Sequence, residues 1–268
     1  MGCSYTKSGH GGTGAQTHAV LPTITPAVAF VLVMATSALG IYSHCRRWWR
    51  GVGADADVAG SGGIKELVVA RHRDLLRLVA HVTLCAFMFG WHVHEKAALM
   101  VTVPLALALA SEVSAARSNK SSDGKSAASS ALFASGEYLF LSTVVHYAIT
   151  PLLFKLREWP IKVLVVALGT AVTRGVLRCA LTGKRASPPC LLGRLQWCYL
   201  IVGLCCLEAY VVAGHALIFP GGRMEFLPLM ITSVYCAVGV VWTWGVQIMG
   251  YVGMDVLRAY SYSSREVN

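Results

Sequence analysis

Charged side chains are scarce in this sequence of 268 residues. Asp, Glu, Lys and Arg together make up 13% of the chain, whereas a soluble domain carries about 25%. Hydrophobic residues account for 55% of the chain, and the mean hydropathy is +0.58. This composition excludes an ordinary soluble protein. The sequence therefore predicts an all-α fold, a polytopic helix bundle that crosses the lipid bilayer.

Acidic residues are scarcer still, because 13 of them stand against 23 Lys and Arg, which gives a net charge of +10. Such an excess is typical of nucleic-acid-binding proteins when the cations form one patch. Here the cations lie between the apolar runs and favour alternate gaps, which is how membrane proteins encode their orientation. We therefore expect the bilayer, and no nucleic acid, as the partner of these charges.

Several catalytic and metal-binding patterns are also missing. The sequence has nine cysteines but no C-x-x-C pair, and it contains no G-x-S-x-G, Walker or H-E-x-x-H motif. Most of the cysteines lie inside apolar runs, where a free thiol behaves as a small hydrophobic group. We expect no metal, no cofactor and no disulfide framework.

Long apolar runs predict about seven transmembrane helices. They cover residues 22–43, 75–91, 97–110, 138–154, 161–181, 197–219 and 227–252. The third run is short, so it must rely on its neighbours, on tilt, or on a start inside the polar segment before it. Residues 1–21 then form a polar N-terminal tail, 22–252 the transmembrane domain, and 253–268 a cytosolic tail.

Positive charges predict which connections face the cytosol. Lys and Arg gather after the first, third and fifth spans and in the C-terminal tail, which makes 44–74 and 111–136 cytosolic linkers. Within these linkers, the Gly-, Ala- and Asp-rich segment 52–63 and the Ser-, Ala- and Lys-rich segment 111–135 are typical of solvated, unstructured chain. The opposite face then receives the polar segment around residues 92–96.

That segment is the most distinctive feature of the sequence, His92-Val93-His94-Glu95-Lys96. On a helix, His92, Glu95 and Lys96 would share one face, whereas in an extended turn the two histidines would share it. In one interpretation Glu95 neutralises Lys96 in a salt-bridged turn. In the other, Lys and His side chains contact a phosphate or sugar and stabilise an anionic leaving group. A zinc site is disfavoured, because a fourth ligand is missing nearby.

A second polar segment joins the sixth and seventh spans, where Pro and Gly residues around Gly221 and Gly222 predict a turn. By the charge pattern this turn lies on the same face as His92. Arg223 is suited either to clamp a phosphate with two hydrogen bonds or to anchor the membrane interface beside Glu225.

Glu208, His81 and His146 are among the polar residues that lie within apolar spans. Glu208 either pairs with His215 or is protonated and structural, and we favour a structural role because membrane carboxylates usually face a bundle interior. His81 and His146 lie on apolar helices and are interpreted as core histidines with satisfied hydrogen bonds.

Four blocks of the sequence resemble the dolichyl-phosphate-glucose-dependent α-1,3-glucosyltransferases of the endoplasmic reticulum. The blocks cover residues 89–97, 151–154, 158–162 and 222–237. Trp91, immediately before the H-V-H-E-K core, is similar to the branch that adds the second glucose to the lipid-linked oligosaccharide.

The resemblance implies a GT-C-type fold in a multi-pass membrane protein of the endoplasmic reticulum. The expected reaction moves glucose, with inversion, from dolichyl phosphate glucose to a lipid-linked oligosaccharide acceptor that already bears one glucose. No nucleotide sugar and no metal take part. The resemblance implies that the dolichyl phosphate leaving group is stabilised by His92, His94 and Lys96. It also implies that the substrate is bound and oriented by Arg223 and Glu95.

One part of the family pattern is not found. Family members are longer, and their N-terminal half carries a lumenal loop with the acidic residue expected to act as general base. Residues 1–21 contain no Asp or Glu, so we expect the chain to correspond to the C-terminal half. The alternatives are a non-catalytic fragment, a half-enzyme whose partner chain supplies the base, or a small proton-coupled transporter. The transporter is disfavoured because the sequence shows no internal repeats.

Overall fold

The computed structural model describes residues 25–55, 63–90, 95–118, 124–153, 156–182, 190–220 and 224–252. Within these residues the chain forms helices and no strands, which confirms the predicted all-α bundle. The long helices are α1 (Pro26–Asp55), α2 (Gly63–Phe89), α3 (Leu99–Ser118), α4 (Gly124–Leu153), α5 (Trp159–Thr182) and α9 (Leu227–Val252). The 3₁₀ segments η1 (Glu95–Ala98) and η2 (Leu156–Glu158) precede α3 and α5.

The pass between α5 and α9 is built from consecutive helical segments that change type. They are α6 (Arg194–Cys198), the π-helical η3 (Tyr199–Gly203), α7 (Leu204–Ala209), the π-helical η4 (Tyr210–Gly214) and α8 (His215–Ile218). We call this pass, residues 194–218, the segmented span.

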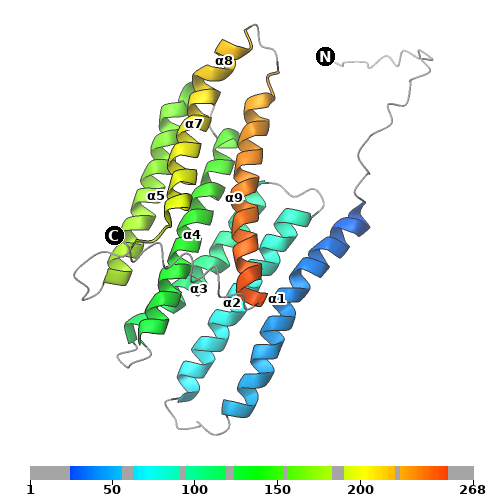
Figure 1. Cartoon of the computed structure of the whole chain (residues 1–268), viewed down its shortest axis with the longest axis vertical. Coiled ribbons are helices and arrows are strands. Elements are labelled where there is room, and N and C mark those ends of the chain that lie inside the picture. Colours follow the sequence, from blue (N-terminus) through cyan, green and yellow to red (C-terminus); the bar gives the residue numbers. More distant parts are fainter. Residues whose placement is uncertain are drawn as a thin grey trace, which may run out of the picture.

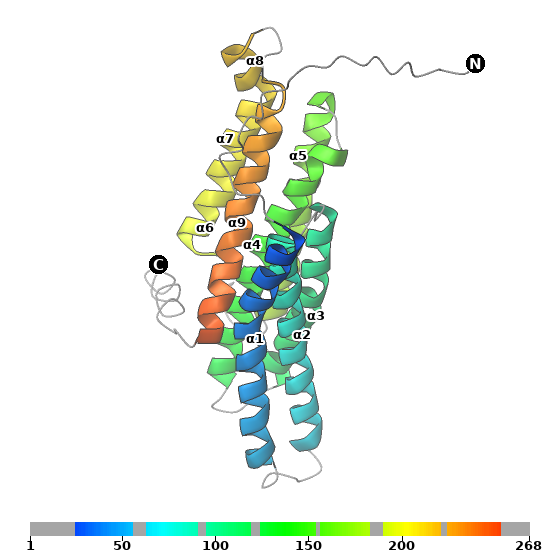
Figure 2. The same ribbon diagram turned by 90° about the vertical axis from the view of Figure 1, so that its right-hand side faces the viewer.

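Successive passes run in opposite directions through the bundle, as Figure 1 shows. In the described part of the chain, six helices are long and apolar enough to cross a membrane. The seventh pass, α2, is long enough but carries several charged residues in its first half. The alternating directions of the passes place the cation-rich connections at one end of the bundle, as the charge pattern requires. Figure 2 shows that α1 and α2 extend beyond the other helices at that end.

The third pass begins inside the polar pentapeptide, as one of the sequence alternatives required. η1 starts at Glu95 and leads directly into α3. The helix then continues past the predicted end at residue 110 to Ser118, so the pass is long enough to span.

The prediction of an unstructured segment at 111–135 is wrong for the residues that the structure describes. Residues 111–118 belong to α3, and residues 124–135 belong to α4. Alanine-rich sequence has high helix propensity, and here small side chains also permit close packing. Ala131, Ala134 and Ser135 are buried. The linker predicted at 44–74 is likewise helical where it is described, because residues 44–55 belong to α1 and residues 63–74 to α2. The tails 1–21 and 253–268 and the segment 56–62 lie outside the described residues, so the predictions for them stay predictions.

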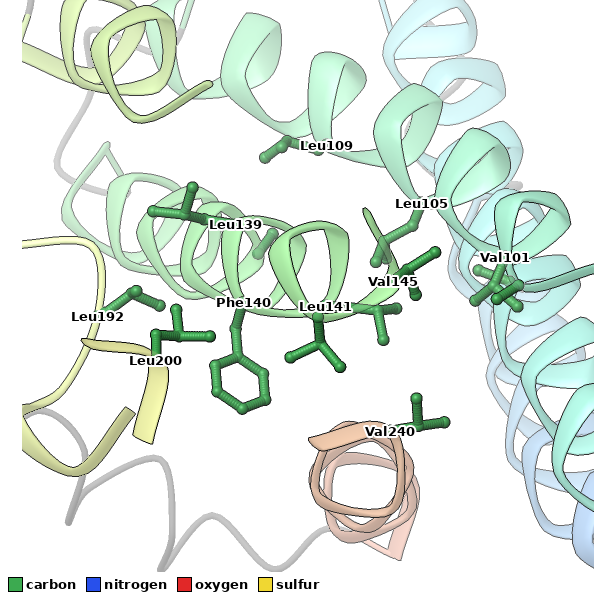
Figure 3. Close-up of a cluster of buried hydrophobic side chains, with 14 of the residues drawn as sticks. Val101, Leu105, Leu109, Leu139, Phe140, Leu141, Val145, Leu192, Leu200 and Val240 are labelled. Carbon is green, nitrogen blue, oxygen red and sulfur yellow. The ribbon is translucent and has the colours of Figure 1, made fainter. Parts of the chain in front are cut away.

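Helix α4 lies at the centre of the bundle, and its apolar side chains hold the surrounding helices together. Figure 3 shows α4 between α3, which contributes Leu105 and Leu109, and α9, which contributes Val240. Leu192 and Leu200 approach α4 from the beginning of the segmented span. Each of these side chains is almost fully buried, and complete burial of such a side chain contributes about 1.5–3 kcal/mol.

A close backbone approach on α4 gives the first testable prediction. A Cβ atom added at Gly136 would collide with the backbone carbonyl of Leu191, and a backbone atom cannot move aside as a flexible side chain can. Gly136→Ala is therefore expected to lower the free energy of unfolding by about 1–3 kcal/mol, as overpacked cores do. Chemical or thermal unfolding of the protein in detergent measures this change.

The matched control is Gly169→Ala on α5, where nothing lies within 4 Å of the added methyl group. There we expect a gain of about 0.5–1 kcal/mol, because alanine is the better helix former. Equal effects of the two substitutions would contradict the packing interpretation.

Candidate functional site

The described end of the polar pentapeptide belongs to η1, at the end of the bundle where α2, α3 and α4 meet. Its last two residues, Glu95 and Lys96, open η1, and η1 packs against α2 and α4 as well as α3. His92 and His94 lie outside the described residues, as do the side chains of Glu95 and Lys96. The structure therefore places only the backbone of η1 beside α4, and the roles of the side chains of the pentapeptide stay predictions.

The second polar segment forms the predicted turn between the segmented span and α9. Pro220 is the last described residue before the gap at 221–223, and the chain resumes at Met224 in a turn that leads into α9. The Leu227 N–H donates to the Met224 carbonyl at 2.9 Å. Met224 has a φ of 57°, a left-handed conformation that is uncommon for residues other than glycine. Arg223 itself lies outside the described residues, so its role also stays a prediction.

A buried charged cluster joins α4, α5 and the segmented span, and we call it the Lys162 cluster. It consists of Lys162, Glu208 and Tyr147. The Lys162 ammonium forms an ion pair with Glu208 Oε1, and the Tyr147 hydroxyl donates to the same oxygen at 2.5 Å. The ammonium also lies 4.9 Å from the centroid of the Tyr147 ring, within the range of a cation–π interaction. The tyrosine therefore contacts the carboxylate through its hydroxyl and the ammonium through its ring face.

This geometry overturns one of the two alternatives for Glu208, its pairing with His215. The carboxylate pairs with Lys162 and Tyr147, while His215 Nδ1 lies 3.1 Å from the hydroxyl of Tyr210. His215 lies on the same span as Glu208, whereas Lys162 and Tyr147 reach the carboxylate from α5 and α4. The sequence did contain a signal for this contact, because isolated opposite charges in two apolar spans usually pair.

Helix type changes on both sides of Glu208. It lies in α7, which has π-helical η3 before it and π-helical η4 after it. π-helical turns are rare and occur frequently at functional sites. In η3, Tyr199 forms a reciprocal contact with Tyr235 of α9, in which each hydroxyl donates to the backbone carbonyl of the other. The two rings are stacked with centroids 4.5 Å apart.

A second polar network lies in the other half of the bundle, and the sequence interpretation missed it. The Arg77 guanidinium of α2 forms an ion pair with Glu112 of α3. Gln247 of α9 donates to Glu137 of α4 at 2.7 Å, and His81 Nδ1 lies 3.0 Å from the Gln247 side-chain oxygen. Both glutamates fall in or next to the segment predicted to be a solvated linker, so the sequence indicated no buried partner.

The two core-histidine predictions have different outcomes. His81 is fully buried and satisfied, with Gln247 on one ring nitrogen and the Cys85 thiol 3.6 Å from the other. His146 is hydrogen-bonded to the Ser142 carbonyl at 2.6 Å, but its side chain is exposed on α4. Its placement in the core was wrong, because the side chain lies on an exposed face of α4.

Metal coordination finds no support in the described part of the chain, where no group of three or more His, Cys, Asp or Glu residues could hold an ion. The Lys162 cluster instead balances its charge within the protein. Chemically the cluster is suited to fix helices in place. The predicted phosphate-binding side chains belong instead to two connections, the one before α3 and the one before α9.

Comparison with known proteins gives the family. The model of the family described as "ALG6, ALG8 glycosyltransferase family" matches residues 4–247. A dolichyl pyrophosphate Glc1Man9GlcNAc2 alpha-1,3-glucosyltransferase of Arabidopsis thaliana is 30% identical over 84% of this chain and 38% of its own length. Proteins of the same name from Bos taurus and Coccidioides immitis (strain RS) are 31% and 35% identical, over 85% and 62% of this chain and 35% and 30% of their own. No solved structure matches the chain.

The chain therefore spans about 35–38% of the length of the Arabidopsis and bovine relatives. The match to the family model nevertheless covers most of the sequence, from the N-terminal tail to the last helix. The chain belongs to the ALG6, ALG8 glycosyltransferase family.

Proposed function

We propose that this chain takes part in transferring glucose from dolichyl phosphate glucose to the monoglucosylated lipid-linked oligosaccharide that is the precursor of N-glycans. The observation that carries the proposal is the family membership, together with the names of its relatives. Each relative described above is named for the Glc1Man9GlcNAc2 acceptor. Trp91 before the H-V-H-E-K core supports the same acceptor. The site of the reaction in this proposal is the lumenal face of the endoplasmic reticulum membrane.

In the proposed reaction, an acceptor hydroxyl attacks the anomeric carbon of the donor and loses its proton to a general base, which family members carry in their N-terminal half. The bond between that carbon and the phosphate oxygen breaks, and its electron pair stays on the oxygen. Dolichyl phosphate leaves with the negative charge. His92, His94 and Lys96 stabilise that charge, since cationic and N–H donors aimed at a developing anion lower the barrier most effectively. Arg223 binds the phosphate through charge-assisted hydrogen bonds, and Glu95 orients the cationic cluster.

Two features of the described structure support this assignment. η1, which begins with Glu95 and Lys96, packs on α4, and the connection that follows the segmented span belongs to the same end of the bundle. The Met224 backbone, adjacent to Arg223 in the sequence, is held in a sparsely populated conformation. Such conformations cluster at functional sites because the surrounding structure must over-determine them.

Reconstitution tests the proposal directly. The purified chain is placed in liposomes with dolichyl phosphate glucose and one of two acceptors, the monoglucosylated lipid-linked oligosaccharide or the same oligosaccharide without glucose. We expect transfer to the monoglucosylated acceptor. Transfer only to the glucose-free acceptor would assign the chain to the first-glucose step, and transfer to neither would contradict an activity of the chain by itself. Unaided transfer would eliminate the half-enzyme alternative, and proton-coupled solute uptake would favour the transporter.

A further inference from the structure

Two consecutive passes, α5 and the segmented span, are held to the bundle by few buried residues. In α5, which is described along its whole length, Lys162 and Leu177 alone are buried. In the segmented span the buried residues are Leu200 and Leu207. Because an apolar side chain gains little by leaving lipid for another apolar surface, polar contacts and close packing position helices within a membrane. The Lys162 cluster is therefore a principal attachment of these passes to α4.

The burial and contacts of the Lys162 cluster suit it to this attachment. The side chains of Lys162 and Glu208 are 9% and 14% exposed, so both charges have left water and depend on each other. Their partner Tyr147 belongs to α4 and binds both of them. One contact point thus fixes α4, α5 and the segmented span at the same level of the bundle.

The cluster also belongs to the two passes that adjoin the segments carrying the proposed phosphate-binding residues. α4 supplies Tyr147 near its C-terminal end and packs against η1, which contains Lys96. The segmented span supplies Glu208 and then leads through α8 to the turn that contains Arg223. Glu208 lies in α7 between the π-helical turns η3 and η4, and its carboxylate contacts Tyr147 and Lys162.

We propose that Lys162, Glu208 and Tyr147 are positioning residues, which hold the connection that carries Arg223 at a fixed place relative to η1 and its Lys96. This inference rests on the proposed function, in which both connections contact the phosphate of the glucosyl donor. The cluster itself does not touch the substrate.

The test removes both charges together, so that no unpaired charge is left buried. In the double variant Lys162→Met/Glu208→Gln, the KM for dolichyl phosphate glucose is expected to rise about 10- to 100-fold. This rise corresponds to the loss of one charge-assisted hydrogen bond to the donor phosphate. The KM for the oligosaccharide acceptor is expected to stay unchanged. A mere loss of folded protein would lower the apparent kcat and leave both KM values as they are. Lys162→Arg keeps the ion pair and is expected to retain the wild-type donor KM.

A matched control uses the same two passes at the opposite end of the bundle. There the Arg174 guanidinium lies 4.7 Å from the centroid of the Trp197 ring and links α5 to α6. Arg174→Leu removes this link without touching the Lys162 cluster, so the donor KM is expected to stay at the wild-type value. An equal rise in Arg174→Leu and in the double variant would overturn the proposal.

A second measurement does not depend on activity. Spin labels introduced at Leu99 and Phe226, which are 39% and 82% exposed, report the distance between the beginning of α3 and the beginning of α9. The distance distribution is expected to be narrow in the wild type and in Arg174→Leu, and to shift or broaden in the double variant. An unchanged distribution in the double variant would refute the positioning role. If the wild type transfers no glucose, the proposed function fails, and the label distances still decide whether the cluster positions the two connections.

Discussion

Replacing His94 by alanine is expected to slow glucosyl transfer about 10²–10³-fold, which is the usual effect of removing one donor from a charge-stabilising site. In the proposed reaction the imidazole donates to the phosphate oxygen that gains charge as the glycosidic bond breaks. The loss therefore falls on kcat and kcat/KM together, because the contact is strongest in the transition state. Steady-state transfer by purified protein in liposomes measures both parameters.

His72→Ala is the matched control for this experiment. His72 lies in the first half of α2, toward the end of the bundle opposite η1, and its side chain is exposed. The His72→Ala variant should transfer glucose at the wild-type rate, and both His72→Ala and His94→Ala should insert into the membrane normally. Wild-type turnover in His94→Ala would reduce the pentapeptide to a salt-bridged turn, the alternative that its spacing leaves open.

Breaking the Arg77–Glu112 ion pair is expected to give the largest loss of stability in the bundle. Arg77→Met leaves the Glu112 carboxylate buried with no cation bound to it, and removing one partner of a buried pair costs about 3–5 kcal/mol. The second carboxylate oxygen of Glu112 already accepts no hydrogen bond from the described residues, so it offers no compensation. Unfolding in detergent, followed by circular dichroism, measures the loss.

The two partners should respond unequally, because their exposures differ. The Arg77 side chain is 26% exposed, whereas that of Glu112 is 5% exposed. In Glu112→Gln the guanidinium keeps access to water, so the expected loss is smaller than in Arg77→Met. The double variant Arg77→Met/Glu112→Gln leaves no buried charge and is expected to recover most of the stability. Additive losses in the double variant would contradict a direct interaction between the two side chains.

The sequence was informative wherever one local property decided the structure. Apolar runs located all seven helical passes of the described residues, and the cation-rich gaps matched their alternating directions. The turn at Met224 that leads into α9 was also predicted from local chemistry, since Pro and Gly interrupt apolar helices. The start of the third pass at Glu95 was one of three alternatives that the sequence left open.

The sequence was misleading wherever the outcome depended on a distant partner. Residues 111–135 have the composition of a solvated linker, yet Glu112 finds Arg77, 35 positions away, and Glu137 finds Gln247, 110 positions away. Those contacts, together with tight packing of small side chains, make helix more favourable than solvated chain. Glu208 illustrates the same limit, because its partners Lys162 and Tyr147 belong to two other passes.

By itself, then, the sequence determined that this protein is a multi-pass membrane bundle, in which part of the chain each of its passes lies, and which segments resemble a glucosyltransferase signature. These properties follow from hydrophobicity and residue order along the chain. Only the tertiary structure decided which polar side chains meet inside the bundle. The rotation and level of each helix set those pairings, and both depend on packing around α4. They also depend on π-helical turns, which no local pattern in the sequence predicted.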